Sequence, residues 1–165
     1  PAGLRATRLG RVLVLGTQAT IASQAYPKAF AARDAAVVVE QLACPLLVPL
    51  AEEGWFDHPV TEEVIARYLA GTIDSRFDAV VLGCTHYPLL APSFKRLLGD
   101  KAALVHGGGI LAEELRASLR EQGLYNDRRG LGNVRLVATD TVRASGPIFD
   151  HLFGEPLVFE RVDLD

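Results

Sequence analysis

The sequence predicts an α/β protein whose sheet is mostly parallel and flanked by helices. Short apolar runs such as 11–16 and 78–83 end in glycine. Segments with helical character separate these runs, and regular alternation of strands with helices is typical of parallel sheets. Residues 79–82 are uninterrupted apolar sequence, as expected of a parallel strand that is covered on both faces.

Each predicted strand is a run of β-branched or apolar residues that stops near a glycine or a polar residue. In chain order, the predicted strands are 11–16, 35–42, 78–83, 102–105, 134–138 and 157–162. Polar residues follow four of them, at Thr17, Cys44, Cys84-Thr85-His86 and Thr139-Asp140-Thr141. The carboxyl ends of parallel strands share one edge of the sheet, so we expect a cleft along that edge.

The predicted helices connect the strands, at about 18–33, 61–70, 88–98 and 142–153, with one more after the fourth strand. Pro88 suits a first helical turn, because its φ is fixed near the helical value and its missing N–H would be unpaired there anyway. The spacing of Leu111, Leu115 and Leu119 predicts an amphipathic helix after the fourth strand, which Gly123 ends.

Three segments carry no regular pattern. Residues 1–9 show no apolar period and are interpreted as a leader or the end of a linker. Residues 46–50 are apolar but flanked or interrupted by Pro45 and Pro49, which predicts a loop that continues through 52–55. Residues 124–133 are polar and form a second predicted loop.

Composition excludes several classes of protein. The chain has 165 residues, 49% of them hydrophobic, which suffices for a buried core. The net charge is −3 and no basic block suggests binding to nucleic acid or an anionic membrane. No apolar run approaches the ~20 residues that span a bilayer, and no signal peptide is recognisable. Two cysteines do not make a disulfide framework, so a reducing, cytoplasmic setting is expected.

Cys84 and His86 stand out on the loop between strand 78–83 and helix 88–98. Gly83 permits a tight turn at the end of the strand, so both side chains fall at the carboxyl edge of the sheet. A thiol ionises more readily beside a cation or a helix N-terminus, and this loop offers both. The pair is therefore a candidate for catalysis. The alternative is a buried thiol beside an ordinary loop histidine.

The run His106-Gly-Gly-Gly after the fourth predicted strand has three interpretations. A glycine loop that opens a helix can bind an anion. Esterases form an oxyanion hole from a similar run, but this sequence lacks the Gly-x-Ser-x-Gly motif of their nucleophile. The third interpretation is a tight crossover between two lobes. A metal site is not expected, since the cysteines and histidines of these loops lack the paired spacing of metal ligands.

Three segments resemble the motifs of one enzyme family. Residues 80–89, Val-Val-Leu-Gly-Cys-Thr-His-Tyr-Pro-Leu, resemble the second signature of the aspartate/glutamate racemases. Residues 16–26 are similar to that family's Gly-Thr-x-x-Thr-x-x-Ser-x-x-Tyr segment, and residues 44–54 resemble its Cys-Pro-x-x-Val-Pro-Leu-x-Glu loop. The motifs occur in the family's order within about residues 10–105.

The resemblance implies proton transfer without a cofactor. In this family one cysteine thiolate removes the α-proton of glutamate, and a second cysteine delivers a proton to the opposite face. Carried over to this chain, Cys84 is one of the two acid/base thiols, His86 assists its proton transfer, and Glu52 is a supporting acid. The substrate-binding residues implied by the resemblance are Thr17, Thr20, Thr85 and His86.

The chain departs from the family in two respects. The family's Asp-Ser-Gly loop, its Pro-Tyr-Gly segment and the Cys-Asn-Thr motif of the other catalytic thiol do not occur. Cys44 precedes Pro45 and matches a different family position, so a structural thiol is predicted there. The family's acidic and small hydroxyl residues after the fourth strand are replaced by His106-Gly-Gly-Gly. A start at Pro1 without any methionine fits initiator removal or a segment that begins in mid-protein.

We therefore expect the C-terminal portion of a racemase, in which residues 1–105 form one α/β lobe and residues 106–165 return to complete a second. The expected function is interconversion of L- and D-glutamate, which supplies D-glutamate for bacterial cell-wall peptidoglycan. The chain alone is expected to be inactive, glutamate is the expected small-molecule substrate, and a homodimer is possible. The alternatives are an arylmalonate-type decarboxylase, which needs only the cysteine at position 84, and a catalytically inactive racemase-like binding domain.

Overall fold

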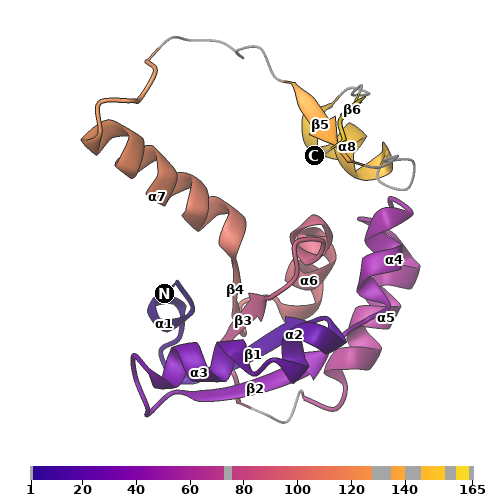
Figure 1. Cartoon of the computed structure of the whole chain (residues 1–165). Coiled ribbons are helices and arrows are strands. Elements are labelled where there is room, and N and C mark those ends of the chain that lie inside the picture. The colour runs from indigo at the N-terminus through magenta and orange to yellow at the C-terminus, as the bar shows by residue number, and fades with distance from the viewer. Residues whose placement is uncertain (1, 73–75, 128–134, 140–145, 155–158, 164–165) are drawn as a thin grey trace.

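The computed structural model describes residues 2–72, 76–127, 135–139, 146–154 and 159–163. The helices and strands in chain order are α1 (Ala2–Ala6), β1 (Arg11–Gly16), α2 (Gln18–Ala22), α3 (Ala25–Ala31), β2 (Val38–Ala43), α4 (Leu47–Glu52), α5 (Pro59–Leu69), β3 (Ala79–Leu82), the 3₁₀ helix η1 (Tyr87–Leu90), α6 (Ala91–Leu98), β4 (Ala103–His106), α7 (Gly107–Glu121), β5 (Leu136–Ala138), α8 (Gly146–Phe153) and β6 (Phe159–Arg161). Figure 1 shows their arrangement.

A four-stranded parallel sheet with the order β2-β1-β3-β4 organises the first part of the chain. Strand β1 is central, and Val14 pairs with Gln41 of β2 on one side and with Val81 of β3 on the other. The chain therefore places β2 on one side of β1, and then β3 and β4 on the other side, so the strand order reverses between β1 and β3. Loops that follow these two strands diverge, and open α/β sheets bind ligands at such a switch point. The predicted parallel α/β fold is confirmed.

Helices cover both faces of this sheet. On one face, Leu13 and Leu15 of β1 are fully buried under α4, α5, η1 and α6, with Tyr87 and Phe94 at the centre of the contact. On the other face, Val12 and Val14 pack against Phe30 of α3 and the end of α1. Alternate residues of one strand thus enter two separate cores, which explains the uninterrupted apolar runs in the sequence.

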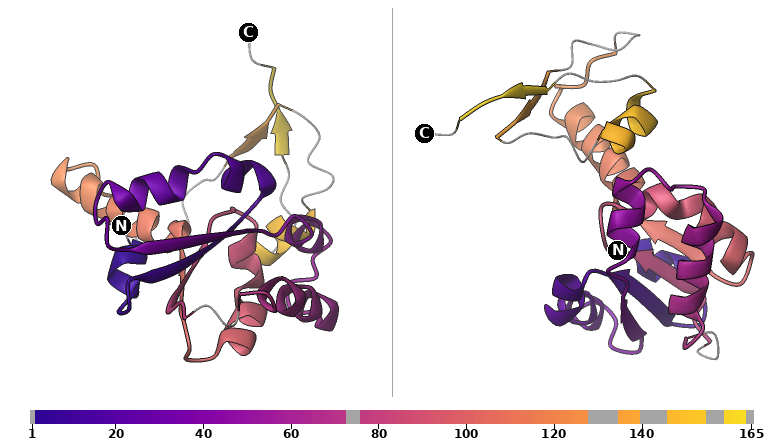
Figure 2. Two further views of the ribbon diagram at one scale, coloured as in Figure 1. Left: turned by 90° about the horizontal axis from the view of Figure 1, so that it is seen from below. Right: turned by 90° about the vertical axis from the view of Figure 1, so that its right-hand side faces the viewer.

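The second part of the chain projects away from this sheet. Helix α7 follows β4 directly, and β5 pairs with β6 in a separate two-stranded parallel sheet. Figure 2 shows the β5–β6 pair standing clear of the four-stranded sheet in both views. The predicted amphipathic helix forms, but Leu111 is 66% and Leu115 56% exposed, and the described residues bury no side chain of α7. The described residues therefore leave most of its apolar stripe uncovered.

The predicted single helix at 18–33 is wrong, because the structure divides it into α2 and α3. Gln24 adopts a left-handed conformation with φ 53° between the two helices. Pro27 provides the physical reason. In a continuous helix its ring would clash with the carbonyl of Ser23, whereas a restart at Ala25 puts it in a first turn, where proline is tolerated.

The prediction of a loop at 46–50 is also wrong. Helix α4 spans Leu47–Glu52, and Pro49 lies in its first turn, where no intrahelical N–H bond is lost. Gly54 follows the C-cap Glu53, and its positive φ of 76° suits a residue without a side chain.

The interpretation of residues 1–9 as a leader or linker is wrong as well, since α1 spans Ala2–Ala6. A helix of five residues is too short to show an apolar period, and packing over β3 and β4 holds it in place. Asp78 then accepts hydrogen bonds from the Thr7 hydroxyl and from the backbone N–H groups of Arg8 and Leu9. Burial opposes ionisation of Asp78, but these hydrogen bonds outweigh it and lower its pKa.

Some predicted positions lie outside the described residues. They are strand residues 134, 157 and 158, helix residues 142–145, Asp140, Thr141, and 128–133 of the polar loop.

Candidate active site

Cys84 lies at the switch point of the sheet, two residues beyond the end of β3 at Leu82. The Gly83 N–H donates to the Leu15 carbonyl at 2.8 Å, which holds the ends of β3 and β1 together. The chain then turns into η1, and the Tyr87 N–H donates to the Cys84 carbonyl at 3.3 Å. This turn leaves the thiol of Cys84 partly exposed at the carboxyl edge of the sheet.

His86 connects the thiol to a carboxylate. Its Nδ1 lies 3.9 Å from Sγ of Cys84, and its Nε2 lies 3.7 Å from Oε1 of Glu52 at the end of α4. A base in contact with a thiol, oriented in turn by a third group, is the usual arrangement for activating cysteine. In this arrangement a protonated imidazole can stabilise a thiolate, and a carboxylate can stabilise the protonated imidazole.

Cys44 has an environment opposite to that of Cys84. Its side chain is fully buried, and burial raises its pKa from 9.0 to about 12. Its carbonyl accepts a hydrogen bond from the Tyr87 hydroxyl at 2.8 Å. This residue therefore joins β2 to the loop that carries Cys84, and its thiol is protonated and inaccessible near neutral pH.

The three threonines of interest occupy different places. Thr85 is exposed and lines the same cavity as Cys84. Thr17 caps helix α2 by accepting from the Thr20 N–H at 3.2 Å, and the two hydroxyls lie 3.0 Å apart. This pair sits after β1, beside the end of β3, but outside the wall of that cavity.

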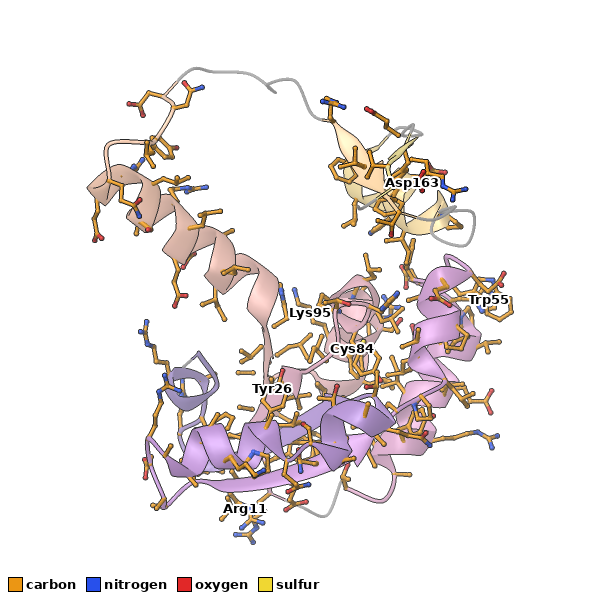
Figure 3. All side chains as sticks on the ribbon, in the orientation of Figure 1. Arg11, Tyr26, Trp55, Cys84, Lys95 and Asp163 are labelled. Carbon is orange, nitrogen blue, oxygen red and sulfur yellow. The ribbon has the colours of Figure 1, made fainter. Side chains whose placement is uncertain are left out.

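An open cavity of about 960 Å³ lies over the switch point. One wall carries Cys84, Thr85 and His86, and the others come from Tyr26, from the start of α7 and from α8. His106 lines it too, and its buried Nδ1 has no hydrogen-bond partner among the described residues. Figure 3 shows Tyr26 and Cys84 at this edge of the sheet.

Tyr26 and His151 also line the cavity, and neither was predicted as a site residue. Tyr26 belongs to the glycine-threonine segment at 16–26, but nothing in its spacing distinguished it. The ring of His151 in α8 contacts that of Phe56 in a tilted arrangement with centroids 4.4 Å apart, a contact between residues distant in sequence. Helix α8 also meets the end of α4, where Pro147 lies beside Gly54.

The described residues hold no cluster of three or more histidine, cysteine, aspartate or glutamate side chains that could bind a metal ion. Among the same residues, no helix combines the length and apolar character required to cross a membrane.

Comparison with known proteins decides the family. The model of the family described as Asp/Glu/Hydantoin racemase matches residues 2–115. The chain belongs to this racemase family. The match contains the whole four-stranded sheet, Cys84 and the start of α7.

Curated members of the racemase family resemble this chain over about half of their own length. A glutamate racemase from Chlorobaculum parvum is 39% identical over 134 residues, which cover 81% of this chain and 49% of the relative. One from Listeria monocytogenes is 40% identical over 125 residues, covering 76% of this chain and 47% of the relative.

Solved racemase structures share the fold of almost the whole chain. A glutamate racemase, isoform RacE1, from Bacillus anthracis has a TM-score of 0.86 at 29% identity and covers 99% of this chain and 61% of its own. A glutamate racemase from Francisella tularensis in complex with D-glutamate has a TM-score of 0.82 at 28% identity and covers 95% of this chain and 59% of its own.

Proposed function

We propose that this chain provides one catalytic half of a cofactor-independent glutamate racemase, with Cys84 as one of its two acid/base thiols. The observation that carries the proposal is the contact chain Glu52–His86–Cys84 at the open cavity. Family membership and the similarity to glutamate racemases support the substrate.

The chemistry follows from the weak acidity of an amino acid's α-proton. Its removal needs a base close to the α-carbon and a site that stabilises the negative charge which develops. The Cys84 thiolate is the base on one face, and the proton it takes becomes the thiol proton. His86 stabilises the thiolate before the transfer, and Glu52 orients the imidazole. In the reverse direction the Cys84 thiol donates its proton to the carbanion.

Inversion also requires an acid on the opposite face. The sequence contains two cysteines, and Cys44 is fully buried, which raises the pKa of its thiol to about 12. We therefore assign the second thiol to a part of the complete enzyme other than this chain. The chain spans about half the length of its curated relatives, which is consistent with this division.

The proposed domain arrangement accounts for the uncovered surfaces. Residues 1–105 form the lobe that carries Cys84, and residues 106–165 belong to a second lobe that a further segment completes. The exposed leucines of α7 and the separate two-stranded sheet β5–β6 support this arrangement. A pair of three-residue strands has little stability of its own and needs neighbouring strands.

Substrate binding is assigned to hydroxyl groups at the carboxyl edge of the sheet. Thr85 lines the cavity beside Cys84, while Thr17 and Thr20 follow the adjacent strand. Hydroxyl and backbone N–H donors suit the two carboxylates of glutamate. The product D-glutamate would serve bacterial cell-wall peptidoglycan, and the enzyme would act in the cytoplasm.

The proposal is tested by following the optical activity of L-glutamate with the complete protein and with the 165-residue chain. We expect steady loss of circular dichroism with the complete protein and none with the chain alone. Cys84→Ser should abolish turnover by the complete protein, and Cys44→Ala is the matched control that should retain it. Full activity of the Cys84→Ser protein would refute the assignment.

A further inference from the structure

Tyr26 lies against the turn that carries Cys84. It is in the first turn of α3, directly after the break at Gln24. A Cβ added to Gly83 would lie 3.0 Å from Cε2 of Tyr26, 3.1 Å from its hydroxyl oxygen and 3.0 Å from the Leu15 carbonyl. The phenol thus lies close to the Cα of Gly83, and a Cβ at that position would make a tight contact with the ring.

The break between α2 and α3 directs Tyr26 to this place. Ser23 Oγ donates to the Thr20 carbonyl at 2.7 Å and accepts from the Ala25 N–H at 3.2 Å, while the Gln24 side chain donates to the Ile21 carbonyl at 2.9 Å. These bonds stabilise a left-handed residue other than glycine, a conformation that carries strain. The strained turn sets the direction from which α3 approaches the sheet.

The Tyr26 side chain forms part of the cavity wall. Tyr26 and Cys84 line the same cavity, and the described residues offer the Tyr26 hydroxyl no hydrogen bond. By contrast, the Tyr87 hydroxyl donates to the Cys44 carbonyl and the Tyr68 hydroxyl accepts from the Leu46 N–H. The oxygen of Tyr26 is therefore available to a group within the site.

We propose that Tyr26 is a positioning residue whose hydroxyl donates a hydrogen bond to the Cys84 thiolate. This inference rests on the proposed acid/base role of Cys84. His86 approaches the sulfur along the loop that carries both residues, whereas Tyr26 approaches from α3. The thiolate would then be held by two donors from different elements, which restricts its direction toward the substrate.

The ionisation of the phenol is consistent with a donor. Burial raises the pKa of Tyr26 above its usual value, and the neighbouring Cys84 raises it further. The phenol therefore holds its proton more firmly than an ordinary tyrosine does. A phenol that retains its proton is a hydrogen-bond donor to an anion beside it.

The test is the pH profile of alkylation of Cys84 in the 165-residue chain by iodoacetamide, with sites identified by peptide mass spectrometry. Because hydrogen bonds to charged groups are the stronger ones, Tyr26→Phe should move the midpoint upward by about one pH unit. The rate on the alkaline plateau should stay close to that of the original chain. A purely structural role would change the plateau or expose Cys44, and would leave the midpoint in place.

Tyr125→Phe is the matched control, because Tyr125 stacks over Arg120 of α7 at 4.6 Å and takes no part in the cavity. Its midpoint should equal that of the original chain. Gly83→Ala should shift the midpoint in the same direction as Tyr26→Phe, because the added Cβ displaces the ring. An unmoved midpoint in Tyr26→Phe, or an equal shift in the control, would overturn the inference.

A measurement on the unaltered ring covers the case in which Tyr26→Phe does not fold. In a chain labelled with ¹³C-tyrosine, the Cζ resonance of Tyr26 should shift over the pH range in which Cys84 becomes reactive. The same resonance in Cys84→Ser should not move over that range, and a matching shift there would count against the contact. If Cys84 is less reactive than Cys44 in the original chain, the proposed function itself fails. That result does not involve Tyr26→Phe, so the two failures are distinguishable.

Discussion

The two cysteines should differ in alkylation rate by about three orders of magnitude or more. Burial raises the pKa of Cys44 from 9.0 to about 12, a difference of three pH units. Near neutral pH its thiolate fraction is therefore about 10³-fold below that of an ordinary cysteine. The side chain of Cys44 is also fully buried, whereas Cys84 lines an open cavity beside His86.

Iodoacetamide labelling of the native chain at pH 7, quenched at intervals and mapped by mass spectrometry, measures both rates in one sample. Cys84 should be labelled while Cys44 remains unmodified, and both should react at similar rates in concentrated urea. The Cys84→Ser chain, as a control, should take up label only on the time scale of unfolding. Labelling of Cys44 at a rate equal to or above that of Cys84 would refute the argument from burial.

Three further predictions concern stability and direction of catalysis. Asp78→Asn should lower the free energy of unfolding by about 1 kcal/mol. Because the pKa of Asp78 in the native state is lowered, this difference should disappear as the pH falls below 3.8. Urea titrations followed by Trp55 fluorescence measure it. His86→Ala in the complete protein should reduce kcat by about 10²-fold in one direction and by less in the other, with compensating changes in KM. Initial rates measured from each enantiomer test this. Leu115→Ala should leave this chain's stability nearly unchanged but destabilise the complete protein by about 2 kcal/mol. Thermal unfolding measures both effects, and Arg116→Ala is the control.

The sequence predicted the sheet well because its strands are buried on both faces. Strand β1 spans Arg11–Gly16, as predicted, since every residue of the apolar run enters one of the two cores. The predicted strand at 35–42 is displaced slightly, to Val38–Ala43. It lies at the edge of the sheet, where one side lacks a neighbour and the apolar pattern is weaker.

Prolines caused two of the errors in the predicted helices. Pro49 suggested a loop, yet it fits the first turn of α4, and Pro27 required the helix at 18–33 to restart. Proline is tolerated in the first turn of a helix but disrupts the interior of one, and the sequence alone did not show which case applied. The boundaries therefore depend on packing that a local pattern does not contain.

The sequence placed Cys84, Thr85 and His86 on the loop after β3, and the structure has them there, on one wall of the cavity. The motif at 80–89 made this possible, because the three residues are neighbours in sequence. Tyr26 and His151 reach the cavity from distant elements, through a helix break and a ring contact with Phe56. Such long-range contacts leave no periodicity in a single sequence.

Hydrogen exchange at the α-carbon tests the role of Cys84 most directly. The complete protein is incubated with each enantiomer of glutamate in D₂O, and the α-position is followed by proton NMR. We predict deuterium in the α-position of the product from either enantiomer, and loss of racemisation in Cys84→Ser. A decarboxylase would exchange no glutamate but release CO₂ from an arylmalonate, and an inactive binding domain would do neither. Exchange of both enantiomers at an unchanged rate in Cys84→Ser would contradict the account.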